Sequence, residues 1–211
     1  MKKMIPAIAL VVCLAATGFA QIWTEDFTGQ EGKGLSGTVA LGVVTNMTGV
    51  TNWTVAGGQD LDGDTSLNWW QVTNGVFQGQ DVGAATADWE SKAIDISAEN
   101  LVSISMDLAQ VENGFTTGPR YFKVFYKLDG GAEQLLLYVS MTNQASYDGT
   151  TFTSPGIDVS AASTLSVLTR IYVTVGGDGW QFDNVVVAAG AGPTNVQFTA
   201  ASASVAGTKS C

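Results

Sequence analysis

The chain has 211 residues, 45% of them hydrophobic, with 19 acidic residues, 9 basic residues and no histidine. Its net charge of −10 disfavours a nucleic-acid partner, because polyanions are repelled and no Lys/Arg cluster offers a local exception. The lack of histidine excludes Ser-His-Asp and Cys-His nucleophile systems, His-ligated zinc and imidazole acid–base catalysis.

A secretory signal peptide is predicted at residues 1–20. Lys2 and Lys3 precede an apolar run at residues 5–16, and a small-x-small cleavage sequence follows. The run is shorter than the roughly twenty residues of a membrane-spanning helix, so we expect a secreted or cell-surface protein without membrane insertion. Removing 20 of the 211 residues leaves 191, with a net charge of −12 after the loss of two lysines. The mature chain then contains one cysteine, Cys211, and no internal disulfide.

The sequence of the mature chain predicts an all-β fold with a single domain at residues 21–190. Helical periodicity is almost absent, whereas alternating apolar positions and β-branched residues recur between Gly, Asn and Asp clusters. The predicted strands cover residues 23–28, 75–78, 89–96, 102–108, 120–128, 134–139, 165–175 and 180–188. This number of strands is typical of a two-sheet antiparallel jelly-roll β-sandwich.

The clearest predicted element is a hairpin over residues 120–139. Alternate apolar residues from Phe122 to Leu128 share one face of its first strand, while Lys123 and Lys127 lie on the other. An Asp-Gly-Gly turn follows, and its residues tolerate positive φ angles. A later strand, residues 165–175, is predicted to be central, with Thr169 as its one polar residue toward the core.

The domain is expected to end near residue 190. Residues 188–193 are Ala-Ala-Gly-Ala-Gly-Pro, a composition typical of a flexible linker. Residues 191–211 are therefore predicted to be a linker and a strand-like tail, which cannot fold alone because its short strand at residues 196–198 has no partner.

Several short aromatic and acidic motifs occur in a particular order between residues 22 and 188. They are Trp23-Thr24-Glu25-Asp26-Phe27, Asn52-Trp53-Thr54-Val55, Asp60-Leu61-Asp62-Gly63-Asp64 followed by Trp69-Trp70, Trp89-Glu90-Ser91, and Trp180-Gln181-Phe182-Asp183-Asn184-Val185. In this order they resemble the MAM-like and cleaved-adhesin-like jelly-roll modules of secreted bacterial proteins. The tail, from Pro193 to Phe198, resembles the opening strand of a Calx-beta module, which implies further modules in a longer polypeptide.

One candidate metal site is local in sequence. Asp60, Asp62 and Asp64 alternate in a Gly-containing turn, where carboxylate oxygens can converge on one Ca²⁺ ion. The segment is not an EF-hand, because Thr65 and Gln71 stand where that loop needs glycine and glutamate. The alternative is an acidic, solvated turn.

The resemblance implies a second calcium site between the two ends of the domain. In such modules an acidic residue of the first strand and an aspartate of the last strand share a structural Ca²⁺, and Glu25, Asp26 and Asp183 match these positions. The alternative is that Asp183 and Asn184 only form hydrogen bonds to turn backbone.

Tryptophans are the candidate ligand-binding residues, because flat aromatic faces stack on pyranose rings. Trp69, Trp70 and Trp89 are the candidates, with core packing as the alternative. Strand alternation places one of Trp69 and Trp70 inward and the other outward. The remaining tryptophans, Trp23, Trp53 and Trp180, are predicted to lie in the core.

The leading hypothesis is a secreted, non-catalytic adhesion module, stabilised by structural Ca²⁺, that binds a glycan or another extracellular polymer. One alternative is a structural spacer or interaction module of a larger surface protein. Another is a small carboxylate-dependent glycoside hydrolase, with Glu25, Glu90 and Asp183 as candidate acids, which requires two carboxylates a few ångströms apart in a cleft.

Overall fold

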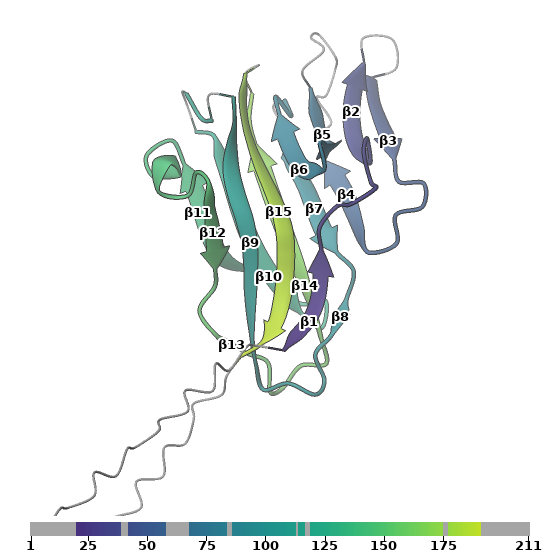
Figure 1. Cartoon of the computed structure of the whole chain (residues 1–211), viewed down its shortest axis with the longest axis vertical. Helices are drawn as coiled ribbons and strands as arrows, with labels where there is room; N and C mark the ends of the chain where they lie inside the picture. The colour runs from purple at the N-terminus through teal and green to yellow at the C-terminus, as the bar shows by residue number, and fades with distance from the viewer. Residues whose placement is uncertain are drawn as a thin grey trace, which may run out of the picture.

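A computed structural model describes residues 20–38, 42–57, 68–83, 86–112, 114–116, 119–174 and 177–190. These residues form two antiparallel sheets packed face to face (Figure 1), so the predicted all-β jelly-roll sandwich is confirmed. In this described part the only helical element is a 3-10 turn, η1 (Gln144–Ser146), and no helix is long and apolar enough to cross a bilayer. Residues 1–19, residues 58–67 with Asp60, Asp62 and Asp64, and the tail from residue 191 lie outside it.

The larger sheet has nine strands. Its order is β12 (Thr150–Thr153), β9 (Leu101–Glu112), β15 (Asp178–Ala189), β6 (Val76–Gln80), β5 (Trp69–Thr73), β2 (Gly34–Thr38) and β3 (Gly42–Asn46), while β1 (Gln21–Glu25) pairs with β15 and β13 (Ile157–Asp158) pairs with β9.

The smaller sheet has six strands. Its order is β11 (Gln134–Ser140), β10 (Tyr121–Leu128), β14 (Thr164–Tyr172), β7 (Ala87–Ser91) and β4 (Trp53–Gly57), and β8 (Ile94–Asp95) pairs with β14.

Each predicted strand overlaps a strand of the structure. The predicted hairpin is confirmed as β10 and β11, whose pairing contains an irregularity between Val124 and Phe125. The prediction of one continuous strand at residues 89–96 is wrong, because the structure has two strands there: β7 ends at Ser91 and β8 begins at Ile94. The first strand ends earlier than predicted, since Phe27 has a φ of 53° and turns the chain out of the sheet.

An aromatic cluster fills the centre of the core between the sheets. It contains Phe27, Trp53, Trp70, Phe77, Trp89 and Phe182, all with 1% exposure or less. The closest pair is Trp70 and Phe77, with ring centroids 4.7 Å apart in an edge-to-face arrangement. Gly79 lies under the Trp70 ring, where a Cβ atom would come within 2.4 Å of the indole. The core therefore requires glycine at this position.

Two strands share one edge of β15. β1 pairs with Val185–Ala188, and β6 pairs with Gly179–Phe182 (Figure 1). Asp183 and Asn184 lie in the gap between them, and the register of β15 against β9 shifts at the same place. Asn184 has a φ of 49°, as expected for a bulge residue. This irregularity fixes where Asp183 lies on the outer surface of the sheet.

Candidate binding site

The outer face of the nine-stranded sheet carries a row of amide side chains. Gln78 of β6 lies between Gln71 of β5 and Gln181 of β15 in the strand register. Cross-strand neighbours project from the same face of a sheet, so the three amides form one row. Trp69 belongs to the same face, opposite Gln80 in the next pair of residues.

The two adjacent tryptophans point in opposite directions, as alternation predicted. Trp70 is fully buried in the core, whereas Trp69 is half-buried on the outer face. Trp89 is also fully buried, because it points inward from β7. The prediction that Trp70 and Trp89 bind a ligand is therefore corrected: core side chains cover their rings. Trp53 and Trp180 lie in the core as predicted, and Trp23 is partly buried against it.

A pocket of about 410 Å³ opens on this outer face, beside the amide row. Its floor is apolar at Val76 and Ala109. The polar residues of the lining come from β9, β12 and β15, and are Asp107, Thr150, Thr151, Gln181 and Asp183. A concave site with an apolar floor and several convergent polar groups is the usual form of a small-ligand site.

The two aspartates of the pocket are directly opposite each other on β9 and β15. Asp107 accepts hydrogen bonds from the Thr151 hydroxyl at 2.5 Å and from the Asn184 side-chain amide at 2.8 Å. One oxygen of Asp183, Oδ1, is by contrast buried without a hydrogen-bond partner. Asn184 thus donates its side-chain amide to a neighbouring strand.

Burial is the main cause that raises the pKa of the Asp183 carboxyl above its ordinary value. A backbone hydrogen bond from Asn184 acts in the opposite direction, while the charges of Asp107, Asp26 and Glu25 raise the pKa further. A hydrogen-bond donor or a cation beside Asp183 would therefore stabilise its ionised form.

The three acidic residues expected to share calcium lie near one another without forming a complete ligand set. Glu25 is buried and accepts hydrogen bonds from the Phe27 backbone N–H at 3.0 Å and from the Gln30 amide at 2.6 Å. Its second oxygen, Oε2, is buried without a partner. Asp26 is exposed. Within the described ranges, no group of three or more His, Cys, Asp or Glu side chains is arranged to hold a metal ion.

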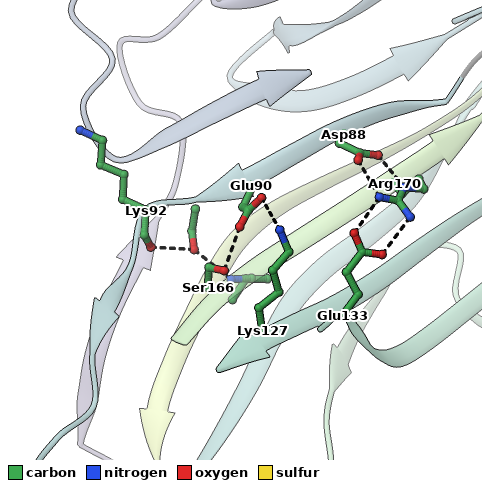
Figure 2. A network of polar contacts seen from close by, with 9 residues as sticks. Asp88, Glu90, Lys92, Lys127, Glu133, Ser166 and Arg170 are labelled. Atoms are coloured by element: carbon green, nitrogen blue, oxygen red, sulfur yellow. Dashed lines mark hydrogen bonds and ion pairs between the residues drawn. The ribbon is translucent and has the colours of Figure 1, made fainter. Parts of the chain in front are cut away.

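The outer face of the six-stranded sheet carries a different polar network (Figure 2). Arg170 binds both oxygens of Asp88 at 2.7 Å and both oxygens of Glu133 at 2.9 Å. Glu90, a candidate acid from the sequence, is bound by Lys127 at 2.8 Å and by the Ser166 hydroxyl at 2.9 Å. Because Glu90 lies on the opposite sheet from Asp183, these two residues do not form a catalytic pair.

Sequence reasoning identified Asp183 and Trp69 but missed Asp107, Thr151 and Gln181. Each of these three residues occupies an outward position of a strand, where a polar side chain is expected simply because the position faces solvent. Asp107 carried one usable signal, because its strand contains no other charged residue between Leu101 and Val111.

No family model matches this chain, and no curated protein matches it. Among solved structures, the chain is similar to a cleaved adhesin domain of Lys-gingipain from Porphyromonas gingivalis, with 14% identity over 82% of this chain and all of that one, and a TM-score of 0.49. It is also similar to the CBM22-1 xylan-binding domain from Paenibacillus barcinonensis, with 13% identity, coverage of 82% and 97%, and a TM-score of 0.38. A structure described as the xylan-binding module CBM15 has 14% identity, coverage of 66% and 92%, and a TM-score of 0.43. At these identities and scores the likeness does not identify a function.

Proposed function

We propose that this protein is a secreted or cell-surface binding module, and that the outer face of its nine-stranded sheet binds a neutral glycan without cleaving it. The observation that carries this proposal is the 410 Å³ pocket, which the polar side chains of Asp107, Gln181 and Asp183 line. Sugar hydroxyls donate to such oxygens and amides, and the half-buried Trp69 indole on the same face offers an apolar surface for a pyranose ring.

The charge of this sheet supports a neutral ligand. Its strands contain six acidic residues, Glu25, Asp107, Glu112, Asp158, Asp178 and Asp183, and no basic residue among the positions that the structure describes. Asp178 is buried and paired with Arg120, but the strands offer no basic side chain to the other carboxylates, so an anionic polymer on this face would be repelled. A neutral polysaccharide meets no such penalty and uses the carboxylates as hydrogen-bond acceptors.

The binding site is tested by affinity electrophoresis in gels that contain single neutral polysaccharides. For the polysaccharide that retards the wild-type protein, we expect Trp69→Ala and Gln181→Ala each to weaken binding at least about tenfold, which corresponds to about 1.4 kcal/mol. Leu135→Ala, at an exposed position of β11 in the other sheet, is the control and should bind like the wild type. If no neutral polysaccharide retards the folded protein, the proposal is wrong and a spacer or interaction module becomes the better hypothesis.

A glycoside hydrolase is the second candidate, and the opposed Asp107 and Asp183 are the observation in its favour, since Asp183 has the raised pKa of a general acid. We place it second because Asp107 is held by Thr151 and Asn184, which engage both of its oxygens. Release of reducing ends from a bound polysaccharide, lost in Asp183→Asn, would contradict the non-catalytic proposal.

Structural calcium is a further part of the proposal. Glu25 and Asp183 each have a buried oxygen without a partner, and a Ca²⁺ ion accepts such oxygens as ligands. Asp26 is the third residue of this predicted set, although the three side chains are not arranged together as metal ligands in the structure. Asp60, Asp62 and Asp64 remain a separate predicted set. Thermal unfolding with EDTA and then with added calcium is the test, because an ion bound only to the native state raises the melting temperature. An unchanged melting temperature would contradict the proposal of structural calcium. Glu25→Gln should abolish any calcium-dependent shift that arises from Glu25, Asp26 and Asp183.

A further inference from the structure

Three tyrosines and one lysine form a cluster on the outer face of the six-stranded sheet, in which the lysine contacts two of the three rings. The ring of Tyr121 lies 5.6 Å from that of Tyr172, nearly parallel to it, and 5.9 Å from that of Tyr138. The ammonium of Lys123 lies 4.1 Å from the Tyr121 ring centre and 5.2 Å from the Tyr138 ring centre. The strand register explains this arrangement, since Lys123 is directly opposite Tyr138, and Tyr121 is opposite Tyr172.

Lys123 differs from the other cations of this sheet. Lys127 is paired with Glu90, and Arg170 is paired with Asp88 and Glu133. Within the described part of the chain, no carboxylate lies within salt-bridge distance of Lys123. The two aromatic rings hold its ammonium in place by cation–π contact but leave its positive charge without a counter-ion.

The tyrosine hydroxyls add hydrogen-bonding capacity to this cation. Burial is the main cause that raises the pKa of the Tyr121 hydroxyl above its ordinary value, so this group remains a donor at neutral pH. Tyr138 is 44% exposed and offers a partly apolar surface to solvent. An ammonium held beside phenol donors and an exposed ring matches a ligand that has both a negative charge and a weakly polar body.

The overall negative charge of the protein does not prevent an anion from binding here. The strands of the six-stranded sheet contain three acidic residues, Asp88, Glu90 and Asp95, and three basic ones, Lys123, Lys127 and Arg170. On the opposite sheet Asp107 and Asp183 project from the outer face, so they lie farther from Lys123 than the spacing of about 10 Å between packed sheets. At physiological ionic strength the screening length is about 8 Å, so their repulsion is largely screened on this face.

We propose that Lys123, Tyr121, Tyr138 and Tyr172 form a second binding site, for a carboxylate-bearing sugar residue of the hexuronate class. The ligand carboxylate pairs with the Lys123 ammonium, its hydroxyls bind the phenol groups, and its C–H surface contacts the Tyr138 ring. This site is independent of the proposed neutral-glycan site, because the two lie on outer faces of different sheets.

The test is isothermal titration calorimetry of the mature protein with a galacturonic acid oligosaccharide at physiological ionic strength, where repulsion from the opposite sheet is screened. We expect wild-type binding that weakens with added salt, a loss of at least about tenfold in Lys123→Met, and a smaller loss in Tyr138→Leu. Lys92→Met removes a lysine elsewhere and should leave the affinity unchanged. The corresponding galactose oligosaccharide, which lacks the carboxylate, should not bind this site.

Absence of wild-type binding, or equal affinity of Lys123→Met and wild type, would overturn this proposal. Binding of the neutral polysaccharide by Lys123→Met shows that the variant is folded and keeps the result separate from that of the first site. Where no neutral polysaccharide binds, the near-ultraviolet circular dichroism of the variant provides the folding control.

Discussion

The two outer faces of the sandwich differ in charge and in how fully their polar groups are paired. The strands of the nine-stranded sheet contain six acidic residues and no basic one, whereas those of the six-stranded sheet contain three of each. On the smaller sheet Arg170 and Lys127 bind their carboxylates closely, while on the larger sheet Asp183 has a buried oxygen without a partner. The outer face of the six-stranded sheet is thus stabilised by its own ion pairs, whereas the nine-stranded sheet retains a hydrogen-bond acceptor without a donor.

The largest expected effect distinguishes the inner from the outer surface of the larger sheet. Trp70→Ala should lower the free energy of unfolding by about 3–5 kcal/mol, because it empties a fully buried site above Gly79. Trp69→Ala, one residue earlier and half-buried, should cost at most about 1.5 kcal/mol. Urea unfolding of both variants measures the difference. Equal losses would mean that Trp69 is also a core residue.

A similar loss is expected where the two sheets are joined by a buried ion pair. Arg120, just before β10, binds Asp178 at the start of β15 at 2.7 Å, with both side chains at most 5% exposed. Arg120→Met leaves a buried carboxylate with Thr116 as its remaining side-chain and backbone partner in the described part of the chain, so we expect a loss of about 3–5 kcal/mol. Lys92→Met, at an exposed position, is the control in the same urea series. A loss below about 1 kcal/mol would show that solvent reaches Asp178.

Two aspartates should give pH effects of opposite sign. The raised pKa of Asp183 means that, without bound calcium, its ionised form opposes folding at neutral pH, so in EDTA Asp183→Asn should be more stable than wild type there. This advantage should shrink as the pH falls through the folded-state pKa. Hydrogen bonds from the backbone of Thr164 and Ser163 lower the pKa of Asp129 at the β10–β11 turn.

Asp129→Asn should therefore be less stable than wild type at neutral pH, and its deficit should disappear as the pH falls through the lowered pKa of Asp129. Melting temperatures of both variants between pH 3 and pH 7 provide the measurement. Deviations of the same sign in the two variants would contradict the assignment of their environments.

The smallest effect is expected on the paired face. Lys127→Met removes a partly exposed ion pair with Glu90, so the change in unfolding free energy should be about 0–1 kcal/mol. Addition of salt should bring the variant and wild type closer together. A loss comparable to that of Arg120→Met would mean that the network of Figure 2 is cooperative.

Sequence patterns predicted the fold more completely than the site. Long strands with alternating residues, such as β10 and β14, were recognised because one of their faces is buried. Short strands such as β2 and β12 were missed, since five or fewer residues rich in Gly and Thr give little periodicity. The direction of Trp69 and Trp70 depends on the register with β6, which local alternation does not define.

The site depended even more on contacts between distant segments. The pairing of Asp107 with Asp183 requires two strands that are separated by more than seventy residues along the chain. Lys123 was predicted to lie on the outer face, but its contact with Tyr138 required the strand register. The residue types indicated which side chains could bind a ligand, while the strand register determined which of these side chains lie next to one another.

The pairing of β1 with the end of β15 has a mechanical consequence. The first and last residues of the sandwich meet at one end, where the Ala189 backbone N–H donates to the Ala20 carbonyl at 2.8 Å (Figure 1). Tension applied between residues 20 and 190 therefore loads this hydrogen bond first and opens β1 from β15 one pair at a time, like a zipper. Pulled in this direction, the domain yields at low force by losing its first strand, while the remaining strands of both sheets bear no load until β1 has separated.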